Sequence, residues 1–185
     1  MVEDVLNDAE SRMKKSIEAA RREMAGIRTG RASPSLVEHL TVDYHGTATP
    51  LAHLATITAT EASLLTIQPW DRQAIGDIQK AIQKSDLGIT PSNDGAVIRL
   101  AIPQLTRERR QELVRQVRKK VEDGRVSLRN IRRDCVDVIR AKEKRKEVSE
   151  DDERRASEQL QKLTDTFIGE LDQVGRAKES EVMEV

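Results

Sequence analysis

The sequence predicts an α+β protein, a discontinuous three-helix bundle with a small domain of strands and one helix inserted into it. Three long segments repeat apolar residues every three or four positions, which is the period of an amphipathic helix. The stretch between the first and second of these segments has the short alternating apolar runs typical of strands. We therefore expect the bundle to comprise residues 1–30 and 105–185, and the inserted domain to comprise residues 31–104.

The first helix is expected within residues 1–30. Its apolar positions recur at intervals of three and four residues: Val5, Ala9, Met13, Ile17, Ala20, Met24 and Ile27. Thr29-Gly30 predicts its end, because glycine readily adopts the left-handed conformation that closes many helices. A helix of about 27 residues would be roughly 40 Å long, so its stripe needs a partner of similar length.

Residues 31–104 are expected to form a small α/β unit, of a size that can fold independently though marginally. Three stretches predict strands, "HLTVDYHG", "LLTIQPW" and "AVIRLAIP", while "PSNDG" predicts a turn. The stretch "DRQAIGDIQKAIQKSDLG" predicts one amphipathic helix that is capped by Asp71. The alternating apolar positions of the first strand are Leu40, Val42 and Tyr44, and those that face inward from the helix are Ile75, Ile78 and Ile82.

Two more long helices, of about 40 and 34 residues, follow the inserted domain. The second is expected to begin after Thr106, whose hydroxyl can cap it, and the third at Ser149, a cap followed by acids that complement the helix N-terminus. Their apolar stripes are Leu113, Val117, Val121, Gly124, Leu128, Ile131, Cys135 and Val138, and then Ala156, Leu160, Leu163, Phe167, Leu171 and Val174. Packing all three helices in one bundle is the simplest way to bury every stripe.

The formal net charge of zero hides an uneven distribution. Residues 105–148 carry 16 Lys/Arg and 8 Asp/Glu, whereas residues 149–185 carry 5 and 11. The second helix is therefore strongly basic and the third strongly acidic. Such a dipolar molecule could present one surface to a polyanion while remaining neutral as a whole.

The basic charge of the second helix is gathered on one side. At about 100° per residue, seven arginines fall within an arc of roughly 100° beside the apolar stripe. These residues, here called the arginine strip, are Arg107, Arg118, Arg125, Arg129, Arg132, Arg133 and Arg140, and among the acids only Glu122 interrupts them. Pairing with the acidic third helix is one interpretation of the strip.

A phosphate partner is the interpretation that the residue type favours. Residues 125–140 contain five arginines and no lysine, and a guanidinium grips phosphate oxygens with two hydrogen bonds. The helix has no aromatic residue on which bases could stack. We therefore expect a folded nucleic acid that is recognised through its shape and backbone.

Signals of catalysis, metal binding and membrane insertion are absent from the sequence. His39, His45 and His53 lack the spacing of a zinc site, and Arg31 stands where a phosphate-binding loop requires lysine. Cys135 occupies an apolar-stripe position, where packing is the expected role. No apolar run approaches a membrane span, and the start of the chain lacks a signal pattern. We expect no catalytic residue, metal, cofactor or membrane contact, and a cytoplasmic location.

Three stretches carry a resemblance to a known family. "IRTGRASPSLVEHLTVDYHGTATPL", "SDLGITPSNDGAVIRLAIPQLTRERR" and "SLRNIRRD" resemble signature stretches of the ribosome recycling factor family, in matching order and spacing along essentially the whole chain. The resemblance implies an elbow-shaped molecule in which the three-helix bundle holds an inserted small β/α/β sandwich domain on a flexible junction. His45 departs from the family, which has a second tyrosine at this position of the turn.

The resemblance also implies a function and a site. Members of this family bind the post-termination ribosome and, with elongation factor G and GTP, separate its subunits. Their "RNxRRD" arginines contact large-subunit ribosomal RNA, which implies this role for Arg129, Arg132 and Arg133. The strip adds Arg118 and Arg125 as expected RNA-binding residues. We expect a monomeric, non-enzymatic translation factor whose partners are the ribosome and elongation factor G.

Two short segments join the expected domains, and both contain a proline that breaks the flanking structure. They are too short to pack as a domain, so we expect them to act as a hinge. The hinge residues are Arg31, Ala32, Ser33, Pro34, Pro103, Gln104 and Leu105.

Two other classes of function remain open from the residues alone. In a structural helical adaptor, the arginine strip would pair with carboxylates of a protein, and co-sedimentation with ribosomes that is lost at high salt would argue against this. A hydrolase assembled from surface carboxylates would require turnover by the isolated protein.

Overall fold

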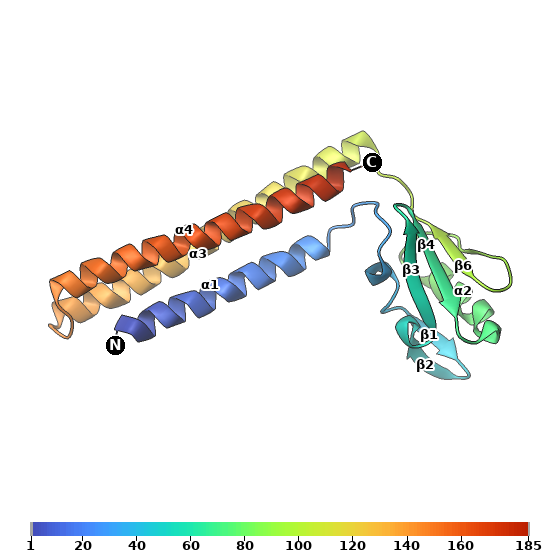
Figure 1. Ribbon diagram of the computed structural model, residues 1–185, viewed down its shortest axis with the longest axis horizontal. Coiled ribbons are helices and arrows are strands. Elements are labelled where there is room, and N and C mark those ends of the chain that lie inside the picture. The colour runs from blue at the N-terminus through green and yellow to red at the C-terminus, as the bar shows by residue number, and fades with distance from the viewer. Residues whose placement is uncertain (1, 185) are drawn as a thin grey trace. The chain divides into compact units, whose positions relative to one another are not determined.

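The structure is a computed structural model that describes residues 2–184. The chain divides into two compact units (Figure 1). One combines the chain up to Thr29 with the chain from Arg107 onward, and the other is Gly30–Thr106. The first is helical and the second mixes strands with a helix, so the predicted α+β class is confirmed.

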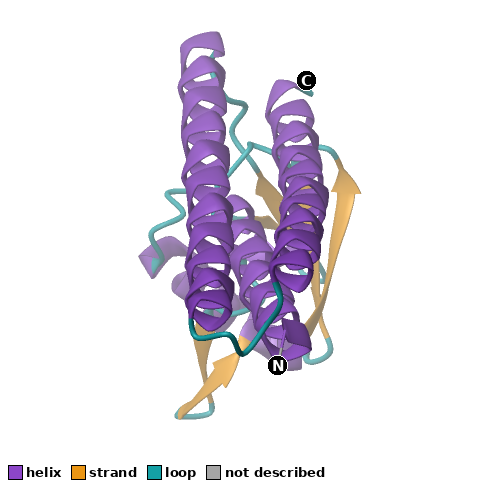
Figure 2. Cartoon of the chain, turned by 90° about the vertical axis from the view of Figure 1, so that its left-hand side faces the viewer, coloured by secondary structure: helices purple, strands orange, loops and turns teal. Residues whose placement is uncertain are grey.

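The helical unit consists of α1 (Val2–Ala25), α3 (Arg107–Lys144) and α4 (Glu150–Met183), each of which packs against the other two. Figures 1 and 2 show α3 and α4 side by side in opposite directions, joined by a short loop at residues 145–149. The side chain of Ser149 accepts a hydrogen bond from Asp152 N at 3.1 Å, which confirms the predicted cap of α4. None of the helices in the described residues is long and apolar enough to cross a membrane.

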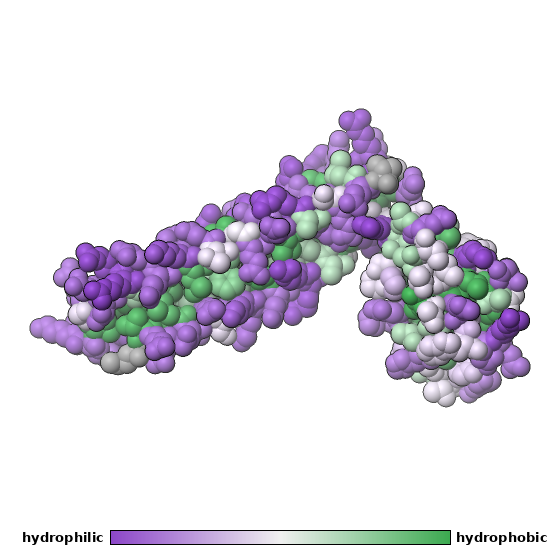
Figure 3. All heavy atoms as spheres, in the orientation of Figure 1, coloured by the Kyte–Doolittle hydropathy of each residue, from purple (hydrophilic) through white to green (hydrophobic). Residues whose placement is uncertain are grey.

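The core of this unit lies along the predicted stripes, and Figure 3 shows hydrophobic residues in a band between hydrophilic ones. The largest side chains that are almost fully buried in it are Met13, Leu128, Ile139, Leu160 and Leu171. Long antiparallel helices with continuous apolar stripes bury them only against one another, which is why the unit needs all three.

One helix end and one core position differ from the sequence prediction. Helix α1 ends at Ala25, before the predicted stop at Thr29-Gly30. Gly26, a poor helix former, follows directly, and Ile27 N then bonds to Met24 O in a tighter turn. In α3 the prediction of Val138 as a stripe residue is wrong: Val138 is 46% exposed, whereas Ile139 is fully buried. A period of 3.6 residues permits either choice after Cys135, and packing decides it.

The stripe of α4 also differs from the prediction at two places. Thr164 and Gly175 are buried where Leu163 and Val174 were expected, and these two side chains are only half-buried. The Thr164 hydroxyl donates to Leu160 O at 2.6 Å, so burial leaves it satisfied. Polar and very small residues are invisible to an apolar pattern, which explains both misses.

The other unit contains a four-stranded antiparallel sheet and a separate hairpin. The sheet has the order β3 (Ala55–Glu61), β4 (Leu64–Pro69), β6 (Ile98–Ala101) and β5 (Ser92–Asn93). The hairpin pairs β1 (Thr41–Tyr44) with β2 (Thr47–Pro50), and α2 spans Ile75–Lys84. The turn predicted at "PSNDG" starts later than expected, because Ser92 and Asn93 pair with β6 and only then does the chain turn.

One core holds the hairpin, the sheet and α2 together. The Asp71 carboxylate accepts a hydrogen bond from Gln73 N at 2.9 Å and so caps the short 3-10 turn Arg72–Ala74 that leads into α2, whereas the N-cap of α2 itself is Ala74. The predicted inward positions of the helix are all buried: Ile75, Ile78 and Ile82. His45 and Gly46 have positive φ values of 50° and 79°, which is the conformation of a tight two-residue hairpin turn.

Candidate nucleic-acid interface

Helix α3 carries all seven arginines of the strip on a single uninterrupted helix of 38 residues. None of the seven is buried. Their neighbours differ, however, because the acidic helix α4 runs alongside α3 over most of its length. The contacts with α4 therefore decide how much of each positive charge is available.

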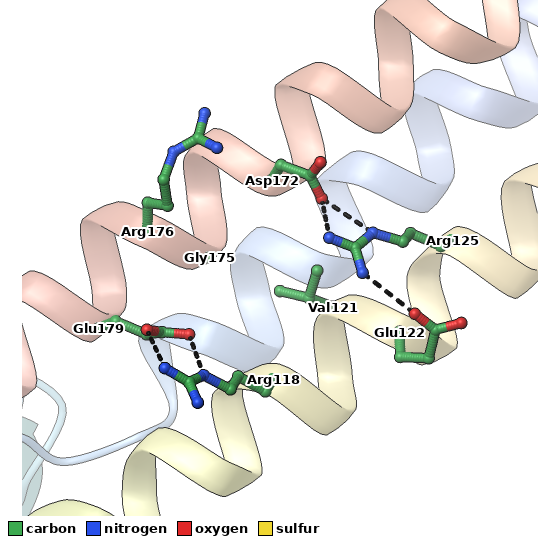
Figure 4. A pocket seen from close by; sticks show the side chains of 8 residues that line it. All are labelled: Arg118, Val121, Glu122, Arg125, Asp172, Gly175, Arg176 and Glu179. Carbon is green, nitrogen blue, oxygen red and sulfur yellow. Dashed lines mark hydrogen bonds and ion pairs between the residues drawn. The ribbon is translucent and has the colours of Figure 1, made fainter.

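Arg118 and Arg125 are paired with carboxylates of α4 (Figure 4). Arg118 donates from Nε and Nη2 to the two oxygens of Glu179 at 3.0 and 3.3 Å. Arg125 donates from Nε and Nη2 to Asp172 Oδ1 at 2.9 and 2.6 Å. These hydrogen bonds are the main reason that the pKa of each guanidinium is raised. Their charge is largely balanced within the protein.

Glycines bring α3 and α4 together at this place. A Cβ atom on Gly175 would lie 2.5 Å from Val121 Cγ2, and one on Gly124 would lie 2.7 Å from Leu171 Cδ2. Because glycine has no side chain, the two helices can pack closely here, and Gly175 lines a surface hollow of about 430 Å³. Figure 4 shows its wall, where the acids Glu122, Asp172 and Glu179 equal in number the arginines Arg118, Arg125 and Arg176. The charges that line this hollow therefore cancel.

Arg129, Arg132 and Arg133 keep more of their charge. Arg129 Nη1 reaches Glu122 Oε1 only at 3.8 Å, and Glu122 also accepts from Arg125. Arg132 Nη1 donates to the neutral side-chain oxygen of Gln161. Arg133 is exposed and has no hydrogen bond or ion pair with any described residue. The three residues form a cationic segment in the middle of the helical unit.

A second hollow, of about 410 Å³, lies between α3 and α4 beside this segment. Its charged residues are three arginines and one acid: Arg132, Arg133, Arg140 and Asp137. Arg140 Nε lies 3.7 Å from Glu153 Oε1, a loose ion pair. A concave surface with excess guanidinium groups and few acids has the chemistry of a phosphate-binding surface.

Cys135 and the three histidines, for which the sequence predicts no catalytic or metal-binding role, lie in the following surroundings. Cys135 is buried, and this burial raises the pKa of its thiol, which opposes formation of a reactive thiolate. His39, His45 and His53 are all exposed. Within residues 2–184, no group of three His, Cys, Asp or Glu side chains could hold a metal ion.

Sequence reasoning missed the α4 residues that contact the strip. Asp172, Glu179 and Gln161 lie outside the apolar pattern and have nothing distinctive in their neighbourhood. One signal was present: Arg118 and Arg125 are seven residues apart, and so are Asp172 and Glu179. In an antiparallel pair of helices such matched spacings bring both pairs into register.

The predicted hinge residues lie at the edge of the mixed unit. Ala32 is buried, and its amide donates to Ala62 O at 2.7 Å. Pro103 and Gln104 are exposed, and Leu105 is half-buried. The two segments of chain lie close together here, because a Cβ atom on Gly30 would lie 3.1 Å from Leu105 Cγ.

The chain is similar to a well-defined set of known proteins. The family model described as "Ribosome recycling factor" matches residues 20–183. The ribosome-recycling factor of Roseiflexus sp. (strain RS-1) is 58% identical over 185 residues, with all of both chains covered. A solution structure of the ribosome recycling factor is 44% identical with a TM-score of 0.77, covering 100% of this chain and 98% of that one.

A second solved structure is similar over the full length of both chains, with 44% identity and a TM-score of 0.66. It presents models for the T. thermophilus ribosome recycling factor and the E. coli elongation factor G bound to the E. coli post-termination complex.

Proposed function

The chain belongs to the ribosome recycling factor family, and from this premise we propose that it binds the post-termination ribosome and separates the subunits together with elongation factor G and GTP. The related structure that holds a recycling factor and elongation factor G on a post-termination complex supports this partnership. As a translation factor of this family, the protein acts in ribosome recycling.

The cationic segment of α3 is the observation that carries the proposed RNA contact. Arg133 is exposed, Arg129 and Arg132 are half-buried, and no carboxylate of the described residues lies closer than 3.8 Å to any of the three guanidinium groups. We place large-subunit ribosomal RNA on this segment. Arg118 and Arg125 are outer RNA contacts, which exchange their α4 carboxylates for phosphates only at an energetic cost.

We assign no chemical step to this chain. Free energy for splitting comes from GTP turnover on elongation factor G, while the recycling factor supplies binding surfaces and needs no cofactor of its own. We propose that it acts as a monomer in the cytoplasm, where translation terminates. The junction residues 31–34 and 103–105 let the mixed unit reorient while the helical unit stays on the RNA.

Replacing Arg132 tests the RNA contact. Arg132→Glu should weaken binding to vacant ribosomes by about tenfold or more, the size expected for loss of a charged contact, because it places a carboxylate against a phosphate. The melting temperature should change little, since substitutions at the surface and outside the core typically change the free energy of unfolding by no more than about 0.5 kcal/mol. Co-sedimentation across a salt series measures the affinity, and circular dichroism measures the melting temperature.

Arg22→Glu is the matched control, because Arg22 is an exposed residue of α1 and undergoes the same change of charge. Ribosome affinity of Arg132→Glu equal to that of the control would refute the RNA assignment. A large loss of stability instead would favour a structural role, in which the strip serves only to pair α3 with α4.

A further inference from the structure

The partner of Arg132 is unusual among the arginines of the strip that contact α4. Arg118, Arg125 and Arg140 face the carboxylates Glu179, Asp172 and Glu153. Arg132 instead donates from Nη1 to the amide oxygen of Gln161, a neutral acceptor. A hydrogen bond to an amide fixes the direction of a guanidinium without cancelling its charge, whereas a carboxylate does both.

The amide of Gln161 is itself held in one orientation. Its Nε2 donates to Asp165 Oδ1 at 2.9 Å, one helical turn further along α4. A carboxylate can only accept, so the nitrogen of the amide must face Asp165 and the oxygen must face Arg132. Asp165 thereby acts on Arg132 through Gln161, in a chain of hydrogen bonds that crosses from α4 to α3.

The geometry leaves most of the Arg132 guanidinium available. One of its five N–H donors is used by Gln161, and no carboxylate lies within ion-pair distance of it among the described residues. Arg132 and Gln161 both line the hollow of about 410 Å³ between α3 and α4, beside the unpaired Arg133. A side chain that is oriented before binding loses less conformational freedom when it meets a phosphate.

We propose that Gln161 and Asp165 of α4 are positioning residues, which hold Arg132 at the hollow for an RNA phosphate while leaving its charge uncompensated. The inference rests on the proposed RNA contact of α3 and extends that contact to a second helix. Helix α4 then has two opposite effects on α3. Its carboxylates neutralise Arg118 and Arg125, whereas the amide of Gln161 orients Arg132 and leaves its charge free.

Gln161 is tested by two substitutions and one control, each measured by co-sedimentation of the full chain with vacant ribosomes. Gln161→Ala should lower the affinity about three- to tenfold, the range expected for loss of one hydrogen bond that orients a charged group. Gln161→Glu should lower it further and should reduce the slope of log affinity against log salt by about one, since Arg132 is then neutralised. The control Gln159→Glu makes the same change of charge at an exposed position two residues away, and it should lower the affinity less than Gln161→Glu does.

Asp165 gives a test in which the sign decides. If α4 acted only through its charge, removing any acid beside the strip would raise RNA affinity. We expect Asp172→Ala to raise it, by up to about fivefold, because Arg125 is released. Asp165→Ala should instead lower it, because Gln161 loses the acceptor that orients its amide. Asp165→Glu, which keeps a carboxylate one turn from Gln161, should retain most of the affinity.

The outcomes separate this inference from the function on which it rests. A normal affinity of Arg132→Glu would overturn both. Lost affinity of Arg132→Glu, together with Gln161→Glu that matches Gln159→Glu or Asp165→Ala that binds more tightly than the parent, would overturn the positioning role alone. Melting temperatures within a few degrees of the parent's show that each variant is folded, and a poorly folded Asp165→Ala leaves Gln161→Ala as the deciding variant.

Discussion

Single residues of the same type have different roles along α3, and their neighbours on α4 decide which. Arg118 and Arg125 are chemically identical to Arg132 and Arg133, yet the first two are held by carboxylates and the last two are not. Exposed ion pairs of this kind contribute little to stability, typically about 0–1 kcal/mol. Their larger effect is on the surface, because they restrict the free positive charge to a short segment.

A single carboxylate in the mixed unit has a pKa that can be tested directly. Asp94 accepts hydrogen bonds from Val97 N at 2.9 Å, Ala96 N at 3.0 Å and Arg99 Nη1 at 2.9 Å. These bonds, the backbone ones foremost, lower its pKa from 3.8 to about 2. Since the folded pKa lies below the unfolded one, the stabilisation is complete above about pH 4 and is lost as the pH falls through about 2.

Carbon-detected NMR of the Asp94 carboxyl group during an acid titration measures this pKa. A midpoint near 2 is expected, and the variant Asp94→Asn should lose less stability than the parent between pH 4 and pH 2. A midpoint at the ordinary value near 3.8 would show that the turn does not hold the carboxylate in solution.

The sequence is a good guide at the residue scale where one local rule decides the outcome. Ser149 caps α4 as predicted, and Asp71 caps the 3-10 turn just before α2, because each cap bond is made within three residues of the chain. Gln161 could not be found in this way. Its role depends on Arg132, which is 29 residues away and on another helix, so it follows only from how the helices pack.

At the scale of elements, the close contact between α3 and α4 depends on the positions of glycines, which have no side chain. Gly175 lies against Val121, and Gly124 lies against Leu171. Gly169 in the same helix α4 has no atom within 4 Å of where its Cβ would be. We therefore expect alanine to have opposite effects on the free energy of unfolding at these two glycines of α4.

Alanine at the two positions tests this packing. Gly169→Ala should stabilise the protein by about 0.5–1 kcal/mol, because alanine is the better helix former and has room. Gly175→Ala should destabilise it by about 1–3 kcal/mol, since its Cβ meets the stiff side chain of Val121. Chemical denaturation gives both free energies of unfolding.

A double variant separates the clash from other effects of the new methyl group. In Val121→Ala, Gly175→Ala should cost less than in the parent, with a coupling of about 0.5–3 kcal/mol between the positions. Equal stabilisation by Gly169→Ala and Gly175→Ala would mean that α3 and α4 are not packed closely at this point.

The sequence predicts that a helix exists better than it predicts where an element ends or how strands pair. The three long helices and α2 were predicted, because the period of 3.6 residues repeats many times in each. The strand β3 was missed, since Thr56, Thr58 and Thr60 are exposed and the run has few large apolar residues to mark it. Its place in the sheet comes from pairing with β4, an interaction that no local pattern encodes.

For the molecule as a whole, the order of the chain constrains what the two units can do. The mixed unit is inserted between α1 and α3, so two segments of chain connect it to the helical unit. Two neighbouring connections restrict motion more than a single linker does and favour rotation about a common hinge. The proposed mechanism uses this hinge, at residues 31–34 and 103–105, when elongation factor G acts on the mixed unit.

Residual dipolar couplings in a weakly aligned sample measure this motion. We expect one alignment tensor to fit the couplings within each unit and no single tensor to fit both, since the chain forms two separate compact units and the proposed hinge would let their relative orientation average. Couplings of both units that fit one tensor would contradict the hinge.

We propose that this chain recycles ribosomes by binding RNA and using a partner GTPase, without chemistry of its own. Light scattering of post-termination ribosomes tests it most directly, because scattering falls when intact ribosomes separate into subunits. We expect a rapid fall in scattering with the chain, elongation factor G and GTP together, a much slower fall with Arg132→Glu, and no GTP hydrolysis by the chain alone. Rapid splitting in a mixture that lacks the GTPase, or nucleotide turnover by the purified chain, would contradict it.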